Sequence, residues 1–72
     1  MDTIFMETAN GKTITLTHEI SSDGYGNEFQ DFRAYVAGKF FDNATTYDLR
    51  QGFIPSKAHD VFREAKASAW NR

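Results

Sequence analysis

Two histidines and a few short acidic motifs are the residues of this chain that could perform chemistry. His18-Glu19 begins like the zinc-binding pattern HExxH, but Ser22 stands where the second histidine would be. His59 is distant in the sequence, and the chain contains no cysteine. Because a protein zinc site needs several such ligands, we expect no metal. His18 is instead expected to be a partly buried, hydrogen-bonded histidine on a strand.

A glycine-rich loop is the next candidate for a binding site. Residues 21–27 read SSDGYGN, a composition typical of turns. The loop does not have the spacing of an EF-hand, and Gly24-x-Gly26 has no third glycine before a helix. Ser56 and the neighbouring His59 do not form a set of nucleophile, base and orienting group. The sequence therefore predicts a non-enzymatic protein without a cofactor.

Length and composition place these residues in one small domain, covering residues 1–72. The chain is 40% hydrophobic, 25% charged and 15% aromatic, as in soluble globular domains. A domain of this length has a thin core, which seven phenylalanines are expected to fill. No segment approaches the roughly 20 apolar residues that span a bilayer. The first residues do not resemble a secretory signal, so we expect a cytoplasmic protein.

The charge of the chain is unevenly distributed. Residues 1–48 carry a net charge of −5 and residues 49–72 carry +3, which together give −2. An acidic surface with exposed aromatic side chains would suit a partner protein with a basic surface. The residues expected to bind this partner are Asp23, Tyr25, Glu28, Asp31, Asp42 and Asp48.

Alternation of apolar and polar residues predicts a hairpin at the start of the chain. Residues 3–8 and 12–20 alternate, and an Asn-Gly dipeptide lies between them. A two-residue loop would pair Ala9 with Lys12, whereas a three-residue loop with a bulge would pair Thr8 with Lys12. The second register gathers more apolar residues on one face, so we predict the bulged loop.

Three further elements are expected after this hairpin. Alternation predicts one strand over residues 29–41. Thr45-x-x-Asp48 resembles a capping box and predicts a short helix that ends before Gly52. Pro55 favours the start of a second, amphipathic helix. The predicted fold is α+β, a three-stranded antiparallel β-meander with a short helix and a C-terminal amphipathic helix packed on one face, in the order β-β-β-α-α.

A small nucleic-acid-binding module is the alternative function. Arg33, Tyr35 and Lys39 share the outer face of the third predicted strand, and a sheet with bases and an aromatic ring can grip nucleic acid. The basic residues of the predicted C-terminal helix are Lys57, Arg63 and Lys66. The acidity of the strand region opposes phosphate binding, so protein binding is the leading hypothesis. Exposed aromatic residues would also suit a homodimer.

Part of the chain resembles a known family. The motifs Ala37-Gly38-x-x-Phe41-Asp42, Pro55-Ser56 and Glu64-Ala65-Lys66-Ala67, within residues 37–67, resemble the small acidic type I-F anti-CRISPR proteins of phages. The resemblance implies a strand, a short acidic helix and a longer helix. It also implies a DNA mimic, an inhibitor whose acidic side chains occupy the DNA-binding surface of the large subunit of a CRISPR surveillance complex. The family's pair of acidic helix residues falls on Tyr47 and Asp48, so only Asp48 carries over as an acid from that pair, while Asp42 matches the end of the first motif.

Overall fold

Four strands and one helix make up residues 2–71, the part of the chain described by the computed structural model. The elements are β1 (Asp2–Ala9), β2 (Lys12–Ser22), β3 (Glu28–Val36), β4 (Lys39–Thr46) and α1 (Ser56–Ser68). Neighbouring strands pair antiparallel in the order β1-β2-β3-β4, so the sheet is a meander. The α+β class is confirmed, but within these residues there are four strands instead of three and one helix instead of two.

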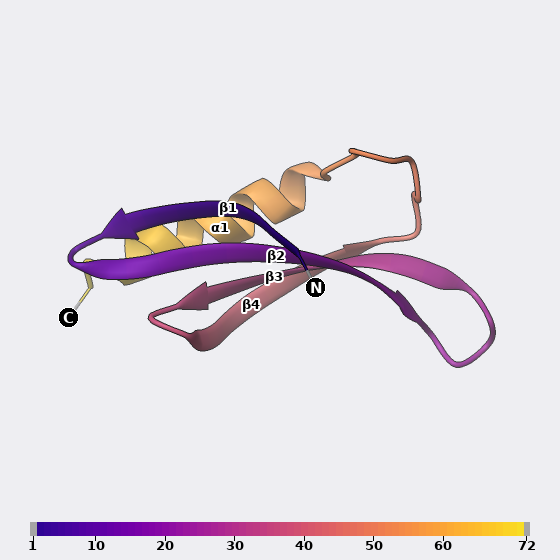
Figure 1. The fold of residues 1–72 in the computed structure, drawn as a ribbon, viewed down its shortest axis with the longest axis horizontal. Helices are drawn as coiled ribbons and strands as arrows, with labels where there is room; N and C mark the ends of the chain where they lie inside the picture. The colour runs from indigo at the N-terminus through magenta and orange to yellow at the C-terminus, as the bar shows by residue number, and fades with distance from the viewer. Residues whose placement is uncertain (1, 72) are drawn as a thin grey trace.

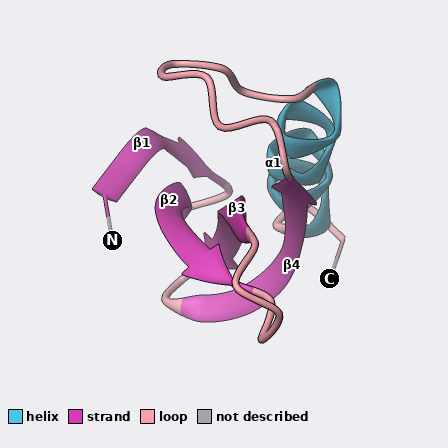
Figure 2. Cartoon of the chain, turned by 90° about the vertical axis from the view of Figure 1, so that its right-hand side faces the viewer, coloured by secondary structure: helices cyan, strands magenta, loops and turns pink. Residues whose placement is uncertain are grey.

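The core lies between α1 and one face of the sheet. The sheet curls, so its strands lie along one side of the helix (Figure 2). Ile14, Leu16 and Phe32 are the largest fully buried side chains. The helix buries the apolar face that its spacing predicts, namely Ala58, Val61, Phe62 and Ala65. Each large apolar side chain stabilises the fold by about 1.5–3 kcal/mol when it leaves water, so stability is concentrated near α1.

The prediction of a bulged three-residue loop in the first hairpin is wrong. The structure pairs Ala9 with Lys12, so the loop has two residues. Both of them are left-handed, with φ of 52° at Asn10 and 73° at Gly11. This is the geometry of the tight turn that an Asn-Gly dipeptide favours. The local preference of the turn therefore outweighs the gain of apolar residues on one face.

In this register some polar residues of the first hairpin lie on the side of the helix, where they form hydrogen bonds with residues of α1 or its C-terminal end. Glu7 lies opposite Ile14 and accepts a hydrogen bond from Lys66 Nζ at 3.0 Å. Asn10 Nδ2 donates to the backbone oxygen of Ala69 at 2.7 Å. The irregularity in the pairing of β1 with β2 lies between Thr3 and Phe5, not at the turn. The helix thus supplies long-range contacts for this hairpin that the alternation pattern could not reveal.

The single strand predicted over residues 29–41 is two strands, β3 and β4. The chain reverses at Ala37 and Gly38, which have φ of 52° and 83°. Alanine rarely adopts this left-handed conformation, so the dipeptide gave no clear turn signal. Residues 39–46 then pair along β3.

The short helix predicted between Thr45 and Gly52 is also absent, since its first part belongs to β4. Ala44 lies opposite Phe32 and is 3% exposed, so pairing with β3 buries this segment against the core. Packing therefore overrides the capping signal of Thr45 and Asp48. The segment that the family resemblance assigns to a short acidic helix is accordingly strand and loop.

The β2–β3 hairpin extends beyond the helix. The molecule measures 41 × 21 × 17 Å, and its long axis follows the strands (Figure 1). After β4 the chain crosses back toward the start of α1 (Figure 1). We call residues 20–30 and 46–50 the distal end. This end lies away from the core and positions most of the predicted partner-binding residues.

Candidate functional site

The loop at the distal end is held by the carboxylate of Asp23. Its Oδ1 accepts hydrogen bonds from the backbone N–H of Tyr25 at 2.8 Å and of Asn27 at 3.3 Å. Its Oδ2 accepts from Asn27 Nδ2 at 3.4 Å, and the Asp23 N–H donates to the Asn27 oxygen at 3.0 Å. These local bonds are typical of aspartate in turns. They fix the backbone on both sides of Tyr25.

Tyr47 connects this loop to the end of β4. Its hydroxyl donates to Asp23 Oδ2 at 3.1 Å, and its ring lies 5.6 Å from that of Phe29. The pKa of Asp23 is lowered, chiefly because the Tyr25 N–H donates to its carboxylate. The pKa of Tyr47 is raised, chiefly by its hydrogen bond to Asp23. The Asp23 carboxylate therefore positions the loop. Tyr47 also belongs to the site, but it was not predicted, because the sequence placed it in a short helix.

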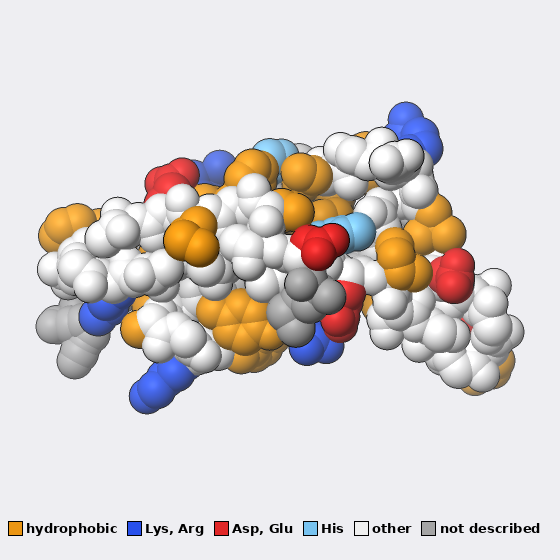
Figure 3. Space-filling model, in the orientation of Figure 1, with side chains coloured by type: hydrophobic (Ala, Val, Ile, Leu, Met, Phe, Trp, Pro, Cys, Tyr) orange, Lys and Arg blue, Asp and Glu red, His pale blue; other side chains and the backbone are white. Residues whose placement is uncertain are grey.

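Tyr25 is the most exposed large apolar side chain of the distal end, at 90%. It lies between Gly24 and Gly26, whose φ values of 90° and 87° are accessible mainly to glycine. Other exposed large apolar side chains at this end are Ile20, Tyr47 and Leu49. Hydrophobic and acidic side chains lie next to each other where the hairpin projects (Figure 3). The arrangement displays an aromatic ring on a fixed backbone.

Two of the predicted acidic contact residues are engaged within the chain. Asp31 is 3% exposed and accepts hydrogen bonds from Arg33 Nε and Asn43 Nδ2, each at 2.9 Å. Asp48 accepts from Arg50 Nε and Nη2, and the pKa of Asp48 is lowered chiefly by these bonds. Their negative charges are largely compensated by the two guanidinium groups.

The remaining acids lie in different places. Glu28 is exposed at the start of β3, next to the loop. Asp42 is exposed on β4, opposite Ala34 and away from the distal loop. The structure thus brings Asp23, Tyr25 and Glu28 to one end of the molecule. Asp42 lies apart from these three residues. Asp31 is buried on the outer face of the sheet by its contacts with Arg33 and Asn43.

The basic residues of the alternative function are dispersed. Arg33 contacts both Asp31 and Glu19, and its pKa is raised chiefly by the hydrogen bond to Asp31. On α1, Arg63 pairs with Asp60 and Lys66 bonds to Glu7. Lys39 and Lys57 are exposed. The outer face and the helix therefore do not combine these five basic residues into one basic surface.

A row of mostly apolar side chains crosses the outer face of the sheet. Met6, Thr15, Tyr35 and Phe40 are successive partners across all four strands. Tyr35 and Phe40 meet edge to face with ring centroids 6.0 Å apart. The row depends on the turn at residues 37–38 and on the register of the first hairpin. Both were predicted wrongly, so the row was not visible in the alternation pattern.

The prediction for His18 is confirmed. The side chain is half-buried, and its Nε2 lies 2.7 Å from Gln30 Oε1. Among residues 2–71 no group of three or more histidine, aspartate or glutamate side chains could hold a metal ion. No helix in the same range is both long and apolar enough to cross a membrane. The chain matches no family model, no curated protein and no solved structure, so its fold and its distal end are the basis for a functional assignment.

Proposed function

We propose that this protein acts by binding a partner protein through its distal end, without catalysing a reaction. Tyr25 is the central contact residue of this proposal. The observation that carries it is a side chain 90% exposed on a backbone that Asp23 holds in place. An aromatic ring buries a large apolar area on binding, and a preorganised loop reduces the entropy lost in doing so.

The charge around Tyr25 suits a basic partner surface. Asp23 and Glu28 flank the loop, whereas Arg50, the basic residue of the distal end, is bound to Asp48. Complementary charges accelerate encounter and select between partners more than they raise affinity. The acidic groups would therefore steer the partner, and the aromatic rings would supply most of the binding energy.

The family resemblance supports a more specific form of the proposal. The partner would be the basic DNA-binding surface of the large subunit of a CRISPR surveillance complex, and the protein would be a phage-encoded inhibitor. Asp48, the acid that the resemblance carries over, is bound to Arg50, and Asp42, which matches the first motif, is exposed. Binding of target DNA by such a complex, measured with and without equimolar protein, tests this form. Undiminished DNA binding would contradict it.

Photo-crosslinking tests the general proposal. A photoreactive phenylalanine analogue is placed at position 25, and in a control protein at Lys57, an exposed residue of α1. We expect a partner to be crosslinked from position 25, to be absent from the control, and to be displaced by excess unmodified protein. Equal capture from both positions would contradict a role for the distal end.

A gel-shift assay at low salt tests the nucleic-acid alternative. We expect no retardation of DNA or RNA, because Arg33 is held between Asp31 and Glu19 and the chain is acidic overall. Salt-dependent binding that disappears in Arg33→Glu and Lys39→Glu variants would support the alternative instead.

A further inference from the structure

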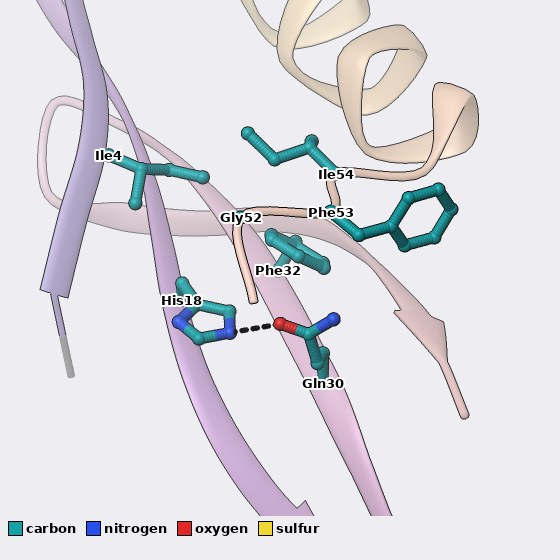
Figure 4. A pocket seen from close by; sticks show the side chains of 7 residues that line it. All are labelled: Ile4, His18, Gln30, Phe32, Gly52, Phe53 and Ile54. Atoms are coloured by element: carbon teal, nitrogen blue, oxygen red, sulfur yellow. Dashed lines mark hydrogen bonds between the residues drawn. The ribbon is translucent and has the colours of Figure 1, made fainter. Parts of the chain in front are cut away.

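A small cavity lies between the sheet and the residues that lead into α1. Its volume is about 110 Å³, and it is open to solvent on one side. Ile4, Phe32 and Ile54 supply apolar walls, while His18 and Gln30 form a polar wall (Figure 4). An enclosed cavity of about 150 Å³ takes benzene. This cavity is smaller, so it has room for at most one ring, part of which would extend through the open side.

The hydrogen bonds of the polar wall fix which atom of Gln30 faces which neighbour. The backbone oxygen of Asp48 can only accept, so the amide nitrogen of Gln30 must face it, at 2.6 Å. The amide oxygen then faces His18, and His18 Nε2 must donate to it, over 2.7 Å. Figure 4 shows this pair beside the ring of Phe32.

Gln30 retains a free acceptor site in this arrangement. A carbonyl oxygen has two lone pairs, and His18 uses one of them. Gln30 is 4% exposed, and it is one of the residues that line the cavity. An acceptor with spare capacity beside an apolar cavity selects a ring that carries one donor.

We propose that this cavity binds a single phenol ring. The ring packs chiefly against the half-buried side chains of Ile4 and Ile54, and the hydroxyl donates to Gln30 Oε1. Gln30 also belongs to the distal end, but the cavity does not include the exposed loop at Tyr25, so phenol binding can be tested apart from the proposed function.

Titration with phenol and toluene tests the assignment on the unmodified protein. The readouts are the NMR signals of the Gln30 side-chain amide and of the Ile54 backbone amide. We expect saturable phenol binding with a dissociation constant on the order of 1 mM, as suits so small a ligand. Toluene should bind at least about threefold more weakly, because it offers no hydrogen bond. A purely apolar cavity would favour toluene, since its methyl group gains more on leaving water than a hydroxyl group does. Equal or tighter binding of toluene would overturn the proposal.

A matched pair of variants tests the location. Ile4→Phe fills the cavity, whereas Met6→Phe adds the same ring to the same strand on the outer face, where Met6 is 64% exposed. Filling the cavity should weaken phenol binding at least about tenfold, and the control should leave it within about twofold. Unchanged phenol binding in Ile4→Phe would overturn the proposal. The comparison of phenol with toluene needs no variant. It therefore tests whether the protein binds a phenol ring even if Ile4→Phe does not fold.

A tyrosine derivative distinguishes the two sources of a phenol ring. Binding of N-acetyl-tyrosinamide as tightly as phenol supports the site and identifies a peptide tyrosine as a source. Binding of phenol alone supports the site and restricts it to a free small molecule. Failure of both ligands to bind overturns the proposal.

Discussion

The helix-covered region and the distal end are built on the same two strands, β2 and β3, but different interactions stabilise them. Near α1, Leu16 and Ala34 lie opposite each other and are both fully buried. At the distal end, Ile20 is 50% exposed, and its partner Gln30 is held by hydrogen bonds to His18 and Asp48. Apolar burial therefore fixes the fold, while polar bonds fix a surface that is free to contact another molecule.

The largest expected effect is in the helix-covered region. Phe32→Ala removes a ring that is 1% exposed, so it should lower the free energy of unfolding by about 3–5 kcal/mol. Tyr25→Ala, the matched loss of a ring at the distal end, should lower it by less than about 0.5 kcal/mol. Urea denaturation measures both values. Comparable losses would show that the two regions are stabilised alike.

The turn between β3 and β4 should respond to a single improved residue. Ala37 has φ of 52°, a conformation that costs alanine free energy and that asparagine tolerates. Ala37→Asn recreates the Asn-Gly dipeptide of the first hairpin and should raise the free energy of unfolding by about 0.5–1 kcal/mol. The reverse change, Asn10→Ala, should lower it by about as much or more, because Asn10 also donates to Ala69. A loss of stability in Ala37→Asn would contradict this account of the turn.

Removing the Asp23 carboxylate should affect the distal end alone. Asp23→Ala deletes the acceptor of the Tyr25, Asn27 and Tyr47 donors, so the loop should open more often. Hydrogen exchange of the Tyr25 and Asn27 amides should accelerate about tenfold, whereas the Leu16 amide should be unaffected. Glu28→Gln removes a charge at the same end and serves as the control. Unchanged exchange at Tyr25 would show that the carboxylate does not hold the loop.

Acid should produce the same opening at a predictable pH. The pKa of Asp23 is lowered, so its carboxylate stabilises the loop above 3.8, its ordinary pKa, and this support is lost as pH falls through the lower folded value. The chemical shift of the Tyr25 amide should therefore titrate with a midpoint below 3.8. The transition should be missing in Asp23→Ala. A midpoint above 3.8 would contradict the assigned hydrogen bonds.

The sequence predicted those parts of the molecule that depend on local periodicity. The spacing of Ala58, Val61 and Phe62 defined the buried face of α1. The composition of residues 21–27 identified the loop, although Ser21 and Ser22 belong to the end of β2. The aspartate and glycines of the loop have the positions that the turn requires. These features are encoded by neighbours in the chain, so they are readable without a structure.

The parts that were missed depend on contacts between distant segments. From the sequence alone, the end of the strand over residues 39–46 looked like the start of a helix. The segment is a strand because its pairing with β3 buries Ala44. The role of Tyr47 depends on Asp23, 24 residues earlier in the chain. The compensation of Asp31 by Arg33 and Asn43 likewise requires the β3–β4 register. The sequence therefore revealed how many acidic residues there are. It did not reveal which of them are bonded within the chain and which are free to contact a partner.

The affinity of the crosslinked partner for three forms of the protein tests the central claim most directly. Isothermal titration would compare the wild type with Tyr25→Ala and with Tyr35→Ala, a tyrosine change on the outer sheet face. The proposed function predicts that Tyr25→Ala weakens binding by about tenfold or more, while Tyr35→Ala leaves it unchanged. Full affinity in Tyr25→Ala, with loss in Tyr35→Ala, would contradict the claim and assign binding to the outer face of the sheet.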